Sequence, residues 1–229
     1  MKKTFGRKLA FLFVATLLAA GTFTSCADNE EETANTPADS LAKPTGTDPF
    51  TTGWYKANIT DSEGHNYDMY YIFDTAERTV DVQEKKEPFD KMKYTYTANT
   101  VTMALYKVTV PDIDAWVSFQ LSDDDSKYPT EWKFVDKSEF ISFVEEVSKK
   151  LIPLIEQQLQ DTTLSDKTRR EYLEETLDYW KNEAKNDAIE ESKEFDEPAV
   201  TYAYTKTGNV ITLTNNTATE KIVLTLIND

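Results

Sequence analysis

YTYTANTVTM (residues 94–103) and YAYTKTGNVITL (residues 202–213) repeat one pattern at two distant points of the chain. Each begins aromatic-x-aromatic-Thr, passes through a turn that contains Asn, and ends with Val or Ile alternating with Thr. Alternation of period two indicates a strand with one buried face, and Asn and Gly accept the positive φ of a tight hairpin turn. The repeat therefore predicts two β-hairpins of one sheet, with an insertion between them.

Strand-like runs surround both copies of this pattern. Short aromatic and β-branched runs, separated by turn residues, occupy residues 53–135, including 114–121 and 130–135, and resume over 199–228. The last three strands alone would form a marginal sheet with an exposed edge. We therefore expect them to pair with the first group.

The intervening segment, residues 136–197, has the period of helices. Apolar residues recur at helical spacing over 137–160 and again over 168–193. Ser138 is the expected N-cap of the first helix, and Pro153 is expected to kink or break it. Two amphipathic helices joined by a short link predict a helical hairpin, inserted before the last three strands.

The N-terminus has the features of an export signal. Residues 1–8 carry four basic side chains and no acid, and residues 9–20 are apolar. Twelve residues rise only about 18 Å as a helix, which is too short for a hydrocarbon core of about 30 Å. A basic segment before a short apolar run is typical of a signal peptide, and we interpret residues 1–25 as one.

The single cysteine of the chain stands directly after this signal. Phe23-Thr24-Ser25-Cys26 resembles the lipobox of bacterial lipoproteins. The resemblance implies cleavage between Ser25 and Cys26, acylation of Cys26, and a cell-envelope lipoprotein of the outer membrane. Such a protein is held to the membrane by its N-terminal lipid anchor and faces the periplasm or the cell surface. The alternative is an ordinary signal peptide with a chance cysteine.

A polar segment separates this cysteine from the strand-like runs. Residues 26–49 contain few apolar side chains and are expected to form a lipidated flexible tether. The folded domain is then expected over residues 50–229, with the helical hairpin 136–197 as its interruption.

The strand series has a second resemblance. Gly53-Trp54 opens the first strand, and a strand meander with Tyr-x-Tyr-Thr hairpins follows. This arrangement resembles the lipocalin-like domains of bacterial lipoproteins. The resemblance implies an antiparallel up-and-down barrel of about eight to ten strands, closed or nearly closed, with room for a cavity. The expected fold is therefore mainly β with an α insertion.

Composition excludes several classes of function. The chain has 41 acidic and 25 basic residues and a formal charge of −16, which argues against nucleic acid as a partner. One cysteine excludes an internal disulfide, and the one histidine, His65, lies in a turn without a second histidine to share a metal. We expect no metal, no cofactor and no catalytic residue. A carboxylate-based hydrolase is the remaining enzymatic alternative.

Aromatic side chains are the remaining functional signal. Period-two alternation places Tyr94 with Tyr96, and Tyr202 with Tyr204, on common strand faces. Such residues either pack the barrel or form a ligand pocket or contact surface. The candidate residues for ligand or protein contact are Trp54, Tyr71, Tyr94, Tyr96, Trp116, Trp132, Tyr202 and Tyr204.

Two functional hypotheses follow from the sequence. The first is a lipid-anchored, non-catalytic envelope protein that binds a small apolar or aromatic ligand inside a lipocalin-like barrel. The second is a protein-interaction or surface-adhesion module with a filled barrel. Its acidic helical hairpin would then be the contact surface for an envelope or host protein.

Overall fold

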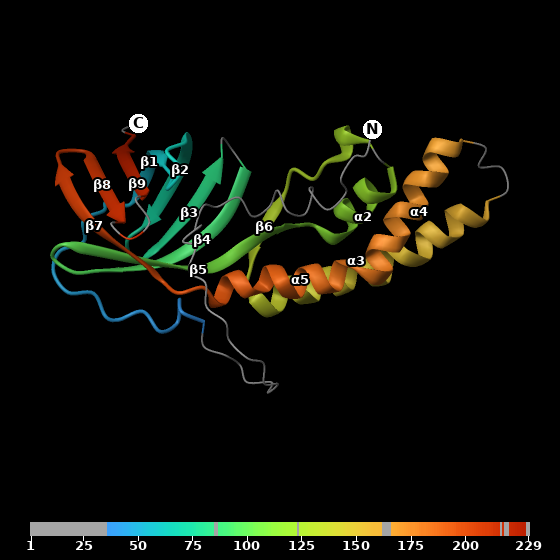
Figure 1. The fold of residues 1–229 in the computed structure, drawn as a ribbon, viewed down its shortest axis with the longest axis horizontal. Helices are drawn as coiled ribbons and strands as arrows, with labels where there is room; N and C mark the ends of the chain where they lie inside the picture. Colours follow the sequence, from blue (N-terminus) through green and yellow to red (C-terminus); the bar gives the residue numbers. More distant parts are fainter. Residues whose placement is uncertain are drawn as a thin grey trace. The chain divides into compact units, whose positions relative to one another are not determined.

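The computed structural model describes residues 36–84, 87–122, 124–161, 166–215, 217 and 220–227. These residues form two compact units. The helical unit runs from Lys107 to Glu194, and the barrel unit comprises the described residues up to Tyr106 together with those from Phe195 onward. Figure 1 labels the α-helices and strands of both units.

The barrel unit is an antiparallel up-and-down barrel of eight strands (Figure 1). Strands that are consecutive in sequence are neighbours around it, in the order β4-β3-β2-β1-β9-β8-β7-β5, and β4 pairs with β5 to close the ring. The predicted barrel with a helical insertion is therefore confirmed. Its strands are β1 (Gly53–Thr60), β2 (Asn66–Asp74), β3 (Thr79–Glu84), β4 (Glu87–Tyr96), β5 (Thr100–Pro111), β7 (Val200–Thr207), β8 (Val210–Asn215) and β9 (Glu220–Leu226).

The two repeated hairpins are neighbours in this barrel. The first is β4–β5 and the second is β7–β8, and they join through β5 and β7, where Val101 pairs with Tyr202. In the first turn Thr97 Oγ1 accepts hydrogen bonds from the backbone N–H groups of Asn99 (3.3 Å) and Thr100 (3.1 Å). In the second turn Gly208 has a φ of 59°, which a residue without Cβ adopts without strain.

Residues 36–50 precede β1 and lie along the barrel unit. Asp39 Oδ1 receives a hydrogen bond from Lys93 Nζ at 2.8 Å, and Phe50 is 5% exposed. The sequence predicts residues 26–49 to be a tether. The structure describes residues 36–49 of this segment, and they are attached to β4 by side-chain contacts.

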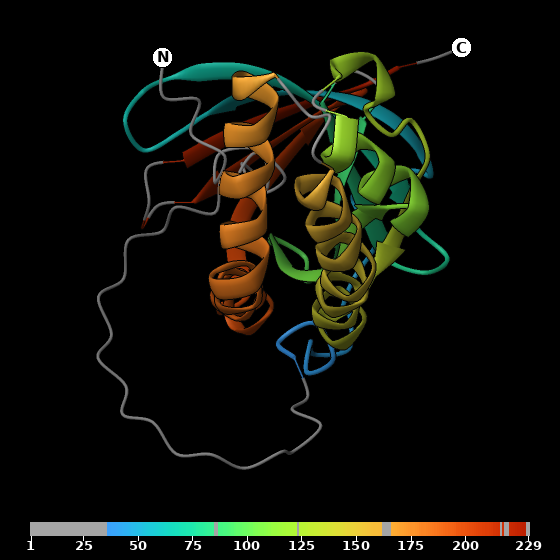
Figure 2. The ribbon, with the colours of Figure 1, turned by 90° about the vertical axis from the view of Figure 1, so that its right-hand side faces the viewer.

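The helical unit contains the end of β5 and the inserted elements. Val108 and Val110 of β5 pair with Val135 and Lys133 of a short strand. Figure 2 shows α3 beside α4 and α5, which is the predicted helical hairpin. The inserted elements are α2 (Ile113–Ser122), η2 (Asp125–Lys127), β6 (Trp132–Val135), α3 (Lys137–Gln160), α4 (Lys167–Asn182), α5 (Ala184–Ser192) and η3 (Lys193–Asp196), whose last two residues belong to the barrel unit.

One predicted strand, residues 114–121, is wrong because this segment forms helix α2. Asp112 Oδ1 accepts hydrogen bonds from the backbone N–H groups of Asp114 (2.9 Å) and Ala115 (3.0 Å), which satisfies donors at the start of the helix. The aromatic and β-branched residues that suggested a strand are buried at helical spacing, as Trp116 and Phe119 illustrate. Trp116 is therefore a helical residue.

The helix boundaries also differ in detail from the prediction. The N-cap of α3 is Asp136, which forms a capping box with Glu139, while Ser138 donates its hydroxyl to Asp136 at 2.8 Å. The helix continues through Pro153 and ends at Gln160. The second predicted helix, 168–193, is divided into α4 and α5 at Glu183.

Candidate functional site

The barrel interior is occupied by the barrel's own apolar side chains. All eight strands contribute to one cluster of buried residues, and Phe50 joins it from the segment before β1. The ring of Phe50 stacks on Phe73, with centroids 3.8 Å apart and an interplanar angle of 16°. Tyr55 and Tyr94 approach the same Phe73 ring at 5.3 and 5.5 Å. These aromatics therefore pack against one another.

Polar groups are buried inside the same barrel. Tyr202 Oη donates a hydrogen bond to Glu220 Oε2 at 3.0 Å, and the two side chains are 3% and 8% exposed. Burial raises the pKa of Glu220, against the opposing effect of the hydrogen bond from Tyr202. Burial also raises the pKa of Tyr71, with further contributions from Glu220, Tyr67 and Asp90. Burial in this interior therefore shifts the pKa of both Glu220 and Tyr71 upward.

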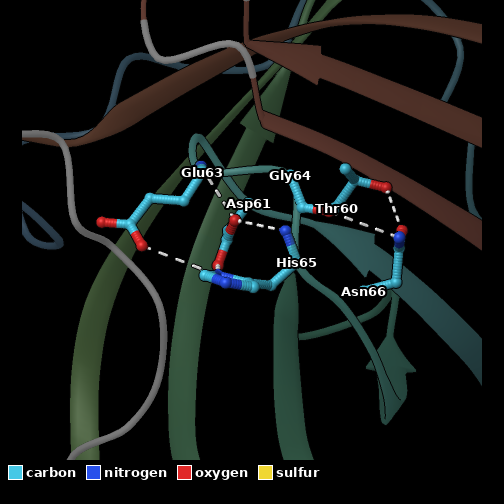
Figure 3. Close-up of polar contacts among 6 residues, drawn as sticks. All are labelled: Thr60, Asp61, Glu63, Gly64, His65 and Asn66. Atoms are coloured by element: carbon cyan, nitrogen blue, oxygen red, sulfur yellow. Dashed lines mark hydrogen bonds and ion pairs between the residues drawn. The ribbon is translucent and has the colours of Figure 1, made fainter.

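The turn between β1 and β2 contains the single histidine (Figure 3). Asp61 Oδ1 accepts hydrogen bonds from the backbone N–H groups of Glu63 and His65, both at 2.9 Å, and Gly64 has a φ of 85°. His65 Nδ1 lies 3.2 Å from Asp61 Oδ2, and its side chain is 71% exposed. Among the described residues no group of three or more His, Cys, Asp or Glu side chains is arranged to hold a metal ion. These contacts fix the turn conformation.

The outer face of the barrel has a partly exposed apolar surface centred on Trp54, in which Trp54 and Ile227 are exposed and Tyr70 and Ile72 are half-buried. Trp54 is 44% exposed and pairs with Ile72 of β2, while its carbonyl accepts a hydrogen bond from the backbone N–H of Ile227 at 2.8 Å. The Tyr70 ring meets the Trp54 ring edge-to-face at 6.4 Å, and Ile227 is 41% exposed. We call Trp54, Tyr70, Ile72 and Ile227 the Trp54 surface. It presents a large aromatic side chain to solvent from a closed barrel.

Two predicted aromatics belong to the helical unit. Trp116 is 1% exposed, and its ring lies 5.4 Å from that of Phe119. Tyr128 connects this pair to Trp132, with ring centroids 5.3 Å from Phe119 and 5.8 Å from Trp132. Trp116 and Trp132 therefore pack in a cluster of their own, within the helical unit.

The eight candidate aromatics do not converge on one site. Tyr71, Tyr94 and Tyr202 are buried in the barrel, and Tyr96 and Tyr204 are half-buried against its core. Tyr204 Oη donates to the carbonyl of Ala98 at 3.0 Å. Trp54 is the candidate that stands on the outer face of the barrel. The predicted lipidation and cleavage residues, Cys26 and Ser25, lie outside the described residues.

Sequence reasoning missed the buried acidic groups of the barrel. Glu220 lies in phase with Ile222 and Leu224 on β9, and Asp90 lies in phase with Met92 on β4. An acid at the inward position of an alternating strand is a readable signal, because period-two alternation places it on the buried face.

None of the helices in the described part of the chain combines the length and the hydropathy that a membrane span requires. Comparisons of the chain with protein-family models, with curated proteins and with solved structures found no match.

Proposed function

We propose that this protein is a lipid-anchored, non-catalytic module of the bacterial cell envelope that binds an envelope or host protein through the Trp54 surface. The observation that carries the proposal is a 44% exposed tryptophan beside exposed Ile227, on a barrel whose interior is filled by its own core. Tryptophan is enriched among the few residues that dominate protein–protein binding energy. Exposed apolar clusters of this kind are typical of contact sites.

The charge of the chain indicates the chemistry of the partner. With a formal charge of −16, the protein favours a partner whose surface is basic around an apolar socket for Trp54. The helical hairpin is the less suitable contact surface. Several of its lysines form ion pairs with its own glutamates, such as Lys181 with Glu156 at 2.6 Å and Lys185 with Glu145 at 2.8 Å.

Site-specific photo-crosslinking in the native cell tests this surface. A photoreactive amino acid replaces Trp54 or Ile227 in the full chain, and adducts are identified by mass spectrometry. We expect one and the same protein to crosslink from both positions. Once that protein is purified, Trp54→Ala is expected to weaken its binding by tenfold or more, since central interface tryptophans commonly contribute at least about 2 kcal/mol.

An exposed position on another strand of the same barrel supplies the matched control. Thr205 of β7 is exposed and lies outside the Trp54 surface. Equal crosslinking from positions 54 and 205 would show that the adduct does not depend on the Trp54 surface. Unchanged affinity of the Trp54→Ala variant, with its fold intact, would overturn the proposed contact.

The lipid anchor rests on the lipobox resemblance around Cys26 and has its own test. Cys26→Ala is expected to abolish acyl labelling and to release the protein from the membrane fraction, because stable anchoring requires the acyl chains on this residue. Labelling with a fatty-acid analogue and membrane fractionation measure the two effects. Retention of Cys26→Ala in membranes would contradict the anchor and leave the contact proposal untouched.

Binding of a small apolar or aromatic ligand inside the barrel is the second candidate function. The observation that favours it is the buried Tyr202–Glu220 hydrogen bond at 3.0 Å, because ligand sites in barrels combine apolar walls with a few placed polar groups. Native mass spectrometry of the protein from its own host separates the two functions. A co-purifying small molecule supports the ligand, and its absence together with the expected crosslinks supports the Trp54 surface.

A further inference from the structure

A groove lies within the helical unit. It has a volume of about 560 Å³ and is formed by α2, η2, α3 and the start of α4. Val117 and Leu121 of α2 and Leu154 of α3 supply apolar wall, and Leu154 is 40% exposed. It is an open groove rather than an enclosed cavity, with a volume inside the range of about 300–1,000 Å³ found for small-molecule sites.

The two ends of this groove differ in charge. At one end Asp114 of α2 is neutralised by Lys150 of α3, with Nζ and Oδ1 2.7 Å apart. At the other end Gln158 of α3 meets Arg169 of α4, and Lys127 lies on the same lining. Arg169 forms no ion pair with the described residues, and Lys127 interacts electrostatically with the neighbouring Asp124, whose pKa it helps to lower. The groove is therefore apolar in the middle and cationic at one end.

Arg169 is held in place but keeps unused hydrogen-bonding capacity. Its Nη2 donates to Gln158 Oε1 at 3.2 Å, and its guanidinium lies over the Tyr172 ring, 5.3 Å from the centroid. Its Nη1 is buried, and no described residue accepts a hydrogen bond from it. Nη1 is therefore not the atom that a ligand would reach, but Arg169 itself lines the groove, and a carboxylate is the group that guanidinium geometry fits best.

We propose that this groove binds a small amphipathic carboxylate, with its carboxylate against Arg169 and Lys127 and its apolar chain against Leu121 and Leu154. The carboxylate pairs with the accessible side of the guanidinium at the cationic end, and the chain covers the exposed Leu154 side chain. In a chain of formal charge −16, a groove lined by Arg169 and Lys127 selects an anion by local chemistry against the overall charge.

Titration of the ¹⁵N-labelled full chain with octanoate tests the proposal. We expect saturable shifts of backbone resonances at Leu121, Leu154 and Gln158. Octanol tests the need for the carboxylate and acetate tests the need for the apolar chain, and both are expected to bind at least tenfold more weakly than octanoate. Equal binding of octanol, equal binding of acetate, or shifts confined to the barrel unit would each overturn the assignment.

Charge-removing variants locate the carboxylate. Arg169→Gln is expected to weaken octanoate binding by tenfold or more, since hydrogen bonds to charged groups commonly contribute about 1.5–3 kcal/mol. Lys127→Gln alters an exposed side chain and is expected to weaken binding by about threefold, which keeps the test valid if Arg169→Gln does not fold.

Lys167→Gln is the matched control for these variants. Lys167 lies in the same helical turn as Arg169, is exposed, and pairs with Glu171 at 3.4 Å. Octanoate affinity is expected to stay within about twofold of the unmodified chain, because Lys167 is paired with Glu171 and does not line the groove. Unchanged affinity in folded Arg169→Gln and in Lys127→Gln, or an equal loss in Lys167→Gln, would show that no carboxylate is bound at this end.

Discussion

Replacement of Phe73 by alanine is expected to lower the free energy of unfolding of the barrel unit by about 3–5 kcal/mol, the usual cost of removing a buried aromatic ring. Phe73 is 1% exposed, and the rings of Phe50, Tyr55 and Tyr94 surround it. Side chains of a closed barrel can only partly collapse into the space that is left, because the ring of paired strands holds their backbones. We therefore expect the upper part of this range.

Hydrogen–deuterium exchange in urea, read from peptides of β1 and β2, measures this loss separately from the helical unit. Trp54→Ala is the control, because it also removes a large aromatic from the β1–β2 pair but from the exposed face. The control is expected to lower the free energy of unfolding by less than about 1 kcal/mol. Equal effects of the two variants would contradict a filled barrel with an outward-facing Trp54.

The repeated hairpin sequences predicted the topology because they combine two independent local signals. Period-two alternation defines strands, and the Asn-containing turns fix the hairpin connections. The two distant hairpins are then expected to join, because the last three strands alone would leave an edge of unpaired backbone groups. Pairing of Val101 with Tyr202 is the contact that this argument requires.

Other features depended on contacts that a sequence pattern does not contain. Residues 114–121 have strong strand propensity, but Asp112 caps a helix and the segment buries Trp116 against other elements of the helical unit. Propensity is a weak prior that local capping and packing override. The sequence could not show this outcome, because the partners of Trp116 are distant in the chain.

The candidate sites also depend on contacts between residues that are distant in the chain. Alternation shows that Trp54 and Tyr55 face opposite sides of one strand, but not which of them points into the barrel. That choice is settled by β9 and β2 together, since Leu226 and Tyr71 flank Tyr55 on the buried side. The groove of the helical unit draws residues from α2, η2, α3 and α4, and no single segment carries its pattern.

Stability of the helical unit is expected to decrease between about pH 4.5 and 7 because of Glu191. Burial, reinforced by Asp187 and Glu194, raises the pKa of Glu191 from 4.5 to about 7, and its Oε2 has no hydrogen-bond partner among the described residues. The folded state therefore keeps this proton over a pH range in which the unfolded state has lost it. The stabilisation from the raised pKa is complete below about pH 4.5 and is lost as the pH rises through about 7.

Glu191→Gln is expected to remove this dependence. At pH 8 the variant should be about 1–3 kcal/mol more stable than the unmodified chain, allowing for the partial solvent exposure of the carboxyl, and the difference should vanish near pH 4.5. Urea unfolding followed by circular dichroism at about 222 nm, where helices dominate the signal, measures this difference in stability.

Glu190→Gln is the matched control, because the neighbouring Glu190 is exposed and pairs with Lys193 at 2.8 Å. Its expected effect stays within about 0.5 kcal/mol at either pH. Parallel pH profiles of the two variants would show that Glu191 is not the group whose proton the folded helical unit retains.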